Sequence, residues 1–117
     1  MPHVVLKGKT KIESIFDKFE PIFLKHGPNI LKTLDMYLDR NKTAILIDSL
    51  VIESNSKQSF FAVINGREDG VVIRLYPKQE VDKTDGVKKL LAEIAKQLIH
   101  QFSDFATAET NLGEYLN

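Results

Sequence analysis

Three consecutive segments rich in β-branched and aromatic residues run through the middle of the chain, and only very short connectors join them. The segments span residues 43–53, 58–64 and 71–76. The connectors, residues 54–56 and 65–70, are shorter than the roughly dozen residues that a parallel crossover needs. The segments are therefore predicted to form an antiparallel meander, which excludes a doubly wound parallel sheet through this region.

The stretch that precedes the meander, residues 30–38, fits two patterns. Leu34, Met36 and Leu38 alternate with Asp35, Tyr37 and Asp39 as in a strand, whereas a helix would place on one face Ile30, Leu31, Leu34, Tyr37 and Leu38. We expect a strand, because the polar tetrapeptide at residues 39–42 separates two apolar runs as a hairpin turn does. A second helix after Pro28 is the alternative.

An N-terminal helix is predicted to begin at Thr10, which lies three residues before Glu13 as in a capping box. Its apolar stripe would comprise Ile12, Ile15, Phe16, Phe19 and Phe23. Pro21 would kink or interrupt it, and Gly27-Pro28 would end it, with His26 stabilising its carbonyl end.

A longer helix is predicted after residue 84, with Thr84 or Asp85 as its cap. Its apolar face would comprise Val87, Leu90, Leu91, Ile94, Ala95, Leu98 and Phe102. The tail, residues 103–117, is more polar, but it spaces Phe105, Leu112, Tyr115 and Leu116 so that it is expected to dock. With 117 residues, of which 43% are hydrophobic, the chain reads as a single α+β domain. We expect a meander of three to five antiparallel strands with both helices packed on it.

Charge and cysteine content narrow the possible partners. Sixteen basic residues balance 16 acidic ones, which disfavours nucleic acid, and the apolar runs are far too short to span a membrane. The chain has no cysteine, which removes disulfides and thiolate chemistry and is compatible with a reducing cytoplasm. A cytoplasmic protein without nucleic-acid or membrane partners is expected.

Gly8-Lys9-Thr10 follows an apolar run and resembles the end of a nucleotide-binding P-loop. However, His3 stands where the first glycine of that loop is required. A capped helix start with solvated lysines is the simpler interpretation, and a weak anion site at this loop is the alternative.

No arrangement typical of an enzyme is present in the sequence. His3, His26 and His100 are widely separated and lack metal-ligand spacing, so no metal, cofactor or catalytic residue is assigned. Glu68-Asp69-Gly70 is interpreted as a turn in which Gly70 supplies a positive φ.

The central segments are apolar at both alternating sets of positions, so both faces of the sheet need a cover. If both helices pack on one face, the other requires the tail, a ligand or a second subunit. Arg74 and Tyr76, with Tyr37, share the more polar face and are the candidate ligand-binding residues. The sequence thus predicts a non-enzymatic interaction module that forms a homodimer through its sheet. The alternative is a domain that binds an anionic or aromatic small molecule between the sheet and the C-terminal helix, with Arg74 and Tyr76 at the entrance.

Overall fold

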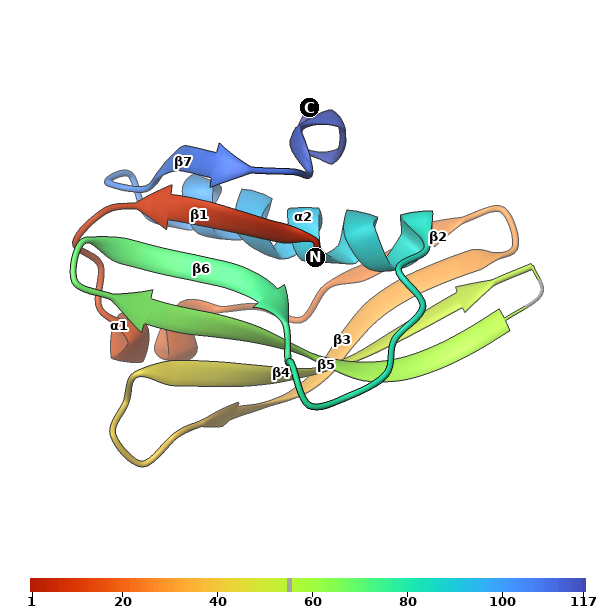
Figure 1. Cartoon of the computed structure of the whole chain (residues 1–117), viewed down its shortest axis with the longest axis horizontal. Coiled ribbons are helices and arrows are strands. Elements are labelled where there is room, and N and C mark those ends of the chain that lie inside the picture. Colours follow the sequence, from red (N-terminus) through yellow and green to blue (C-terminus); the bar gives the residue numbers. More distant parts are fainter. Residues whose placement is uncertain (55) are drawn as a thin grey trace.

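The computed structural model describes residues 1–54 and 56–117. Asn55, in the middle of the first connector of the meander, lies outside the described residues. Two α-helices and a short 3-10 helix accompany the strands (Figure 1): α1 (Ile12–Lys18), α2 (Asp85–Gln101) and η1 (Gly113–Tyr115). The strands are β1 (His3–Lys7), β2 (Phe23–His26), β3 (Asn29–Leu38), β4 (Ala44–Glu53), β5 (Ser56–Arg67), β6 (Gly70–Leu75) and β7 (Ala106–Thr110).

All seven strands belong to one antiparallel sheet with the order β2-β3-β4-β5-β6-β1-β7. The run from β3 to β6 confirms the predicted meander, and residues 30–38 form a strand rather than a helix. The expected three to five strands were too few, because β2 and β7 were not recognised. Both occupy sheet edges and are short, with four and five residues, so neither shows a full alternating pattern.

The N-terminal helix is shorter than predicted. It ends at Lys18, and the chain then turns into β2, which pairs with the start of β3 through a hairpin at Gly27-Pro28. Gly27 has a φ of 59°, a conformation that glycine adopts without strain. Phe23 therefore belongs to a strand, and His26 lies at the end of β2 rather than beside a helix end.

The capping box is also absent. Lys11 occupies the N-cap position of α1 without a side-chain hydrogen bond. The hydroxyl of Thr10 instead donates to Asp104, which follows α2. The Thr10 hydroxyl is thus bonded to a residue distant in sequence, instead of to the helix backbone as in a capping box.

Both helices pack on the same face of the sheet, which we call the inner face; the sheet curls partly around α2 (Figure 1). The buried inner-face side chains are Val4, Leu6, Leu31, Ile45, Ile47, Val51, Phe60, Ala62, Ile64, Val71, Ile73 and Leu75. They form one core with Ile12 and Ile15 of α1 and with the predicted apolar face of α2. The apolar stripe of α2 is thus confirmed, and so is Thr84 as its cap, since its hydroxyl accepts from the Val87 N–H at 3.3 Å.

The tail runs along the edge of the sheet and back onto α2. Phe105 packs edge-on against Phe102 with ring centroids 5.9 Å apart, and β7 then pairs with β1. Leu112 is buried, and the Tyr115 hydroxyl donates to Asp85 at the start of α2 at 2.7 Å. The tail therefore covers the edge of the sheet and the helix, and leaves the second face of the sheet open.

Candidate functional site

The P-loop-like segment holds an acidic side chain where an anion would have to bind. The Asp104 carboxylate accepts from the Lys9 N–H at 2.6 Å and from the Thr10 hydroxyl. These hydrogen bonds, that to Thr10 above all, hold the pKa of Asp104 below its ordinary value of 3.8, although partial desolvation opposes them. The loop is therefore tied to the segment after α2.

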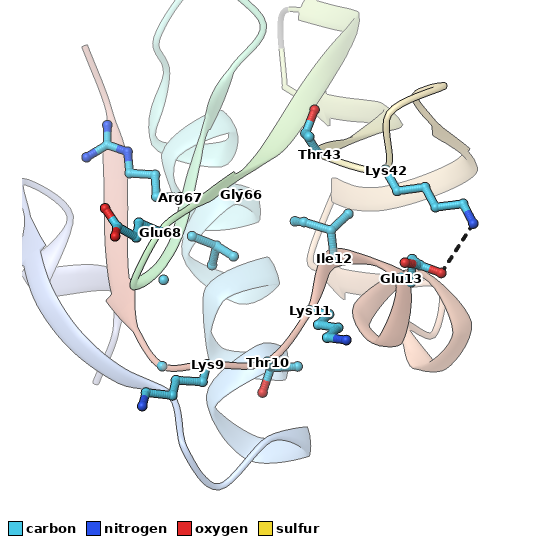
Figure 2. A pocket seen from close by; sticks show the side chains of 13 residues that line it. Lys9, Thr10, Lys11, Ile12, Glu13, Lys42, Thr43, Gly66, Arg67 and Glu68 are labelled. Carbon is cyan, nitrogen blue, oxygen red and sulfur yellow. Dashed lines mark ion pairs between the residues drawn. The ribbon is translucent and has the colours of Figure 1, made fainter.

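The same loop borders a cleft of about 450 Å³ with the hairpins between β3 and β4 and between β5 and β6. Four cationic side chains lie around it, but they do not converge. Figure 2 shows Lys9 and Arg67 on one side and Lys42 on the other, where Lys42 pairs with Glu13 at 3.5 Å. The cleft thus offers no point at which several cations surround one anion.

The bonds to Asp104 give the stability of the protein a pH dependence. Because the folded-state pKa of Asp104 is below the unfolded one, its contribution is present above about pH 4 and disappears as the pH falls through the folded value. We expect Asp104→Asn to lose less stability than the wild type between neutral pH and pH 2. Urea unfolding at a series of pH values measures this, and parallel curves for both proteins would contradict it.

The outer face of the sheet, opposite the helices, carries all three candidate ligand-binding residues. Arg74 of β6 and Tyr37 of β3 lie in one transverse row, in which the register is Tyr37, Leu46, Val63, Arg74. Two strands separate them, so they stand about 14 Å apart at ordinary strand spacing. Tyr76, just after β6, lies two positions beyond Arg74, and its N–H donates to the Phe61 carbonyl at 3.0 Å. The sheet brings Tyr76 near Arg74 but leaves Tyr37 apart from both.

On β5, Arg74 has the apolar Val63 directly opposite and the polar Asn65 diagonally opposite. Its Nε donates to Asn65 Oδ1 at 2.9 Å, which orients the guanidinium across β5. Asp48 of β4 stands diagonally opposite, in the row that contains Phe61. Asp48 alternates with Leu46 and Leu50 along β4 and so lies on the same face, although it was not among the residues predicted from the sequence to bind a ligand.

Several large apolar side chains on this outer face are accessible. Tyr37 is 50% exposed, Leu34 45% and Phe61 36%, and Leu46, Leu50 and Ile52 are half-buried. Within residues 1–54 and 56–117 no helix lies over this face, because both pack on the other one. Both helices thus pack on one face, as considered from the sequence, and no other part of the described chain covers the outer face.

A second pocket, of about 400 Å³, lies between the sheet and α2, where the alternative hypothesis placed one. It is bounded by the β2–β3 hairpin, the end of β4, the first turns of α2 and Tyr115. Arg74, Tyr76 and Tyr37 are not among its lining residues, so they do not guard its entrance. The hydrogen bond to Asp85 raises the pKa of Tyr115 to about 12.

Glu53 at the end of β4 fixes the start of α2 beside this pocket. Its carboxylate accepts from the Thr84 hydroxyl at 2.6 Å and from the Gly86 N–H at 3.0 Å. We expect Glu53→Ala to lower the free energy of unfolding by about 2 kcal/mol, because two hydrogen bonds to a charged acceptor disappear at a helix N-terminus. Urea unfolding at pH 7 measures the loss. Glu80→Ala, at an exposed position, is the control, and an equal effect in both would refute the role of Glu53.

Comparisons with known proteins gave no relative whose function could be carried over to this chain. No protein-family model matches the chain, and searches of curated proteins and of solved structures gave no match. None of the helices in the described part of the chain is both long and apolar enough to cross a membrane. The described residues also contain no group of three or more side chains arranged to hold a metal ion.

Proposed function

We propose that this protein is a non-enzymatic interaction module that forms a homodimer by pairing the outer faces of two sheets. The observation that carries the proposal is the accessible apolar surface around Phe61, which both helices leave uncovered. A cytoplasmic location, expected from the sequence, is part of the same proposal. Burial of such a surface in a second copy would remove apolar area from water without any rearrangement of the fold.

The size of the outer face suits a stable dimer. Six strands, β2 to β1, form it, and their mean length is about eight residues. At about 4.8 Å between strands and about 3.3 Å per residue, this face measures roughly 29 by 26 Å, or about 750 Å². A standard protein interface buries about 600–1,000 Å² on each partner, and the area of the face lies within this range.

The arrangement of charges on the outer face is self-complementary. Asp48 and Arg74 lie on opposite sides of β5, and neither forms an ion pair within the described chain. A two-fold axis between the faces that crosses β5 obliquely, between Phe61 and Val63, would place Asp48 of each copy opposite Arg74 of the other. A two-fold interface requires such reciprocal pairs, and Phe61 would pack against its own symmetry mate.

The residue types around this axis are those that dominate binding energy in interfaces. Aromatic and arginine side chains are enriched among binding hot spots, and here Phe61, Tyr76 and Arg74 are neighbours. We therefore assign Arg74 and Tyr76 to the interface rather than to a small-molecule site, with Tyr37 nearer its rim.

Native mass spectrometry with sedimentation velocity over a range of concentrations tests the proposal. The wild type should be dimeric at micromolar concentration, and Phe61→Asp should weaken the dimer at least about 30-fold, because a central hot spot is replaced by a charge. Asn117→Asp, at an exposed position beyond η1, introduces the same single negative charge away from the face and should leave the dimer intact. A wild-type monomer at all concentrations would refute the proposal.

A charge exchange tests the geometry of the pairing. Asp48→Arg and Arg74→Asp should each weaken the dimer about tenfold or more, because each places like charges opposite one another. The double variant should recover most of the wild-type affinity, since the pair is restored with its signs reversed. If the double variant is weaker than both single variants, Asp48 and Arg74 do not meet across the interface.

A second candidate function, small-molecule binding, is supported by the pocket between the β2–β3 hairpin and α2. Neither Arg74 nor Tyr76 lines this pocket, so the anionic or aromatic ligand expected from those two residues does not apply to it. Native mass spectra of the purified protein would also reveal a bound molecule as an added mass.

A further inference from the structure

The edge strand β2 leaves the main-chain groups of two residues without a partner. The Thr33 N–H donates to the Ile22 carbonyl at 2.9 Å, just before the paired residues of β2 begin. Because hydrogen bonding alternates along an antiparallel pair, Phe23 and Lys25 then direct their N–H and C=O groups away from the sheet. No other group of the described chain bonds them. The free side of β2 can therefore accept a further strand.

Comparable groups elsewhere at the margin of the sheet are satisfied by glutamine side chains. Where β5 extends beyond β6, the Phe61 N–H donates to Gln79 Oε1 at 2.9 Å, and Gln79 Nε2 donates to the Phe61 carbonyl at 2.6 Å. Just before β2, Gln97 of α2 bonds the N–H and the carbonyl of Glu20 in the same way, at 2.8 and 3.0 Å. An amide side chain takes the place of a neighbouring strand at both positions, whereas within residues 1–54 and 56–117 nothing does so along β2.

The other edge strand, β7, is less suited to pairing. Its register with β1 shifts between Val5 and Leu6, and such a bulge disturbs the regular row of groups that a further strand needs. The pairing of β2 with β3 has no shift, and the Phe23 side chain is 62% exposed. Free main-chain groups and accessible apolar surface thus occur together at β2.

The pocket of about 400 Å³ beside α2 extends to this edge. Lys25 borders the pocket, although the register places its side chain on the outer face, opposite Ile30. Lys25 therefore reaches the pocket with its main chain. The inner-face side chains of Leu24 and Leu31 form one wall, and Tyr115 and the start of α2 form the other. A chain paired with β2 would direct every second side chain toward this pocket.

The two sides of the β2 edge differ in charge. On the inner side, Glu53 and Asp85 form no ion pair in the described chain, whereas Glu93 is paired with Lys89 at 3.9 Å. About half a positive charge at the N-terminus of α2 offsets only part of these two carboxylates. On the outer side, Lys25 is exposed and also forms no ion pair within the described residues. A complementary strand would be basic on its inner side and acidic on its outer side.

We propose that β2 binds an extended segment of a partner protein by antiparallel strand addition. The segment would exchange two hydrogen bonds with each of Phe23 and Lys25, and its inner side chains would enter the pocket. From its amino end, its four paired residues would be basic, acidic, apolar and β-branched. They would lie in turn opposite His26, Lys25, Leu24 and Phe23. The basic side chain would point toward Glu53 and Asp85, and the β-branched one would pack on the Phe23 ring.

Isothermal titration with the peptide acetyl-Thr-Arg-Glu-Leu-Val-Thr-amide tests the proposal. We expect a dissociation constant of about 1 mM or tighter. N-methylation of the glutamate or the valine removes an N–H that faces β2, and should weaken binding at least about tenfold. N-methylation of the leucine is the matched control, because its N–H faces away from β2. Absence of saturable binding of the parent peptide would overturn the proposal, as would an effect that does not depend on which nitrogen is methylated.

Charge variants of the protein locate the peptide. Lys25→Glu should weaken the parent peptide about fivefold, and a peptide with lysine in place of glutamate should restore the affinity. Asp85→Asn should weaken the parent peptide about threefold, but not a peptide with glutamine in place of arginine. Asp82→Asn removes the same charge outside the pocket lining and is the control. Thermal unfolding establishes that each variant is folded, and unchanged affinity in folded Lys25→Glu and Asp85→Asn would refute the assignment.

Phe61→Asp separates this inference from the proposed dimer. The edge of β2 lies in the plane of the sheet, whereas Phe61 lies on the outer face, so this variant should bind the peptide as tightly as the wild type. Loss of peptide binding in folded Phe61→Asp would place the peptide on the outer face and refute strand addition at β2.

Discussion

Gly70→Ala is expected to destabilise the protein by about 3 kcal/mol or more. A Cβ atom at this position would overlap the carbonyl oxygen of Leu6 in the neighbouring strand β1. The obstacle is backbone rather than a flexible side chain, so β1 would have to move away from β6. That movement would break the pairing of Lys7 with Gly70 and open the core beneath Leu6, which is fully buried.

Equilibrium urea unfolding at pH 7 measures this loss. Gly113→Ala is the matched control, because a Cβ there meets no atom within 4 Å. It should change the free energy of unfolding by less than about 0.5 kcal/mol. If Gly70→Ala were equally mild, the close approach of β1 and β6 could not be a constraint on the fold.

Leu98→Ala is expected to remove about 3 kcal/mol of stability through a different mechanism. Leu98 is fully buried on the face of α2 that covers the sheet. Truncation to alanine removes its transfer free energy and leaves a cavity, because the helix is held by Phe102 and by the tail and cannot simply move inward. A midpoint shift of about 2 M urea would follow at a slope of about 1.5 kcal/mol per molar.

His100→Ala provides the comparison on the same helix. His100 is exposed, so its truncation should change stability by less than about 0.5 kcal/mol. Because both variants replace a helical residue with alanine, helix propensity favours both, and the difference between them reports burial. A Leu98→Ala midpoint equal to that of His100→Ala would contradict the packing of α2 on the sheet.

The positions of Leu98 and Gly70 illustrate which features of the fold could be predicted from the sequence and which could not. The burial of Leu98 follows from helical periodicity over 17 residues, a long and regular signal. Gly70 was expected to supply a positive φ, but among the described residues the only glycine with one is Gly27. Gly70 is needed because β1 approaches it closely, and no local pattern reveals which distant strand lies beside a residue.

The errors at the N-terminal end have the same origin. The apolar residues from Ile12 to Phe23 fit a helical stripe, but Phe23 belongs to β2, because it pairs with β3 in a hairpin. Thr10 and Glu13 fit a capping box, but Asp104 provided a tertiary partner for Thr10. In both cases a partner distant in sequence outweighed a local preference of about 1 kcal/mol.

The candidate sites show a similar division. Alternation along β4, β5 and β6 was sufficient to place Arg74 and Tyr76 on one face and to state what would follow if the helices shared the other. It could not provide the lining of the pocket beside α2, which combines Lys25, Glu53, Asp85 and Tyr115 from four separate segments. Such a site can be recognised only when the strand register and the docking of the tail are known.

The position of β1 in the sheet has a consequence for how the chain reaches its structure. His3 pairs with Arg74 and Val4 with Thr110, so both neighbours of β1 are made long after it. During synthesis the meander from β3 to β6 can form from local hairpins, whereas β1 has no partner until β6 has emerged. β1 leaves the ribosome before the other strands of this sheet, yet it is among the last of them to be placed, and its apolar residues stay exposed to chaperones and proteases throughout that interval.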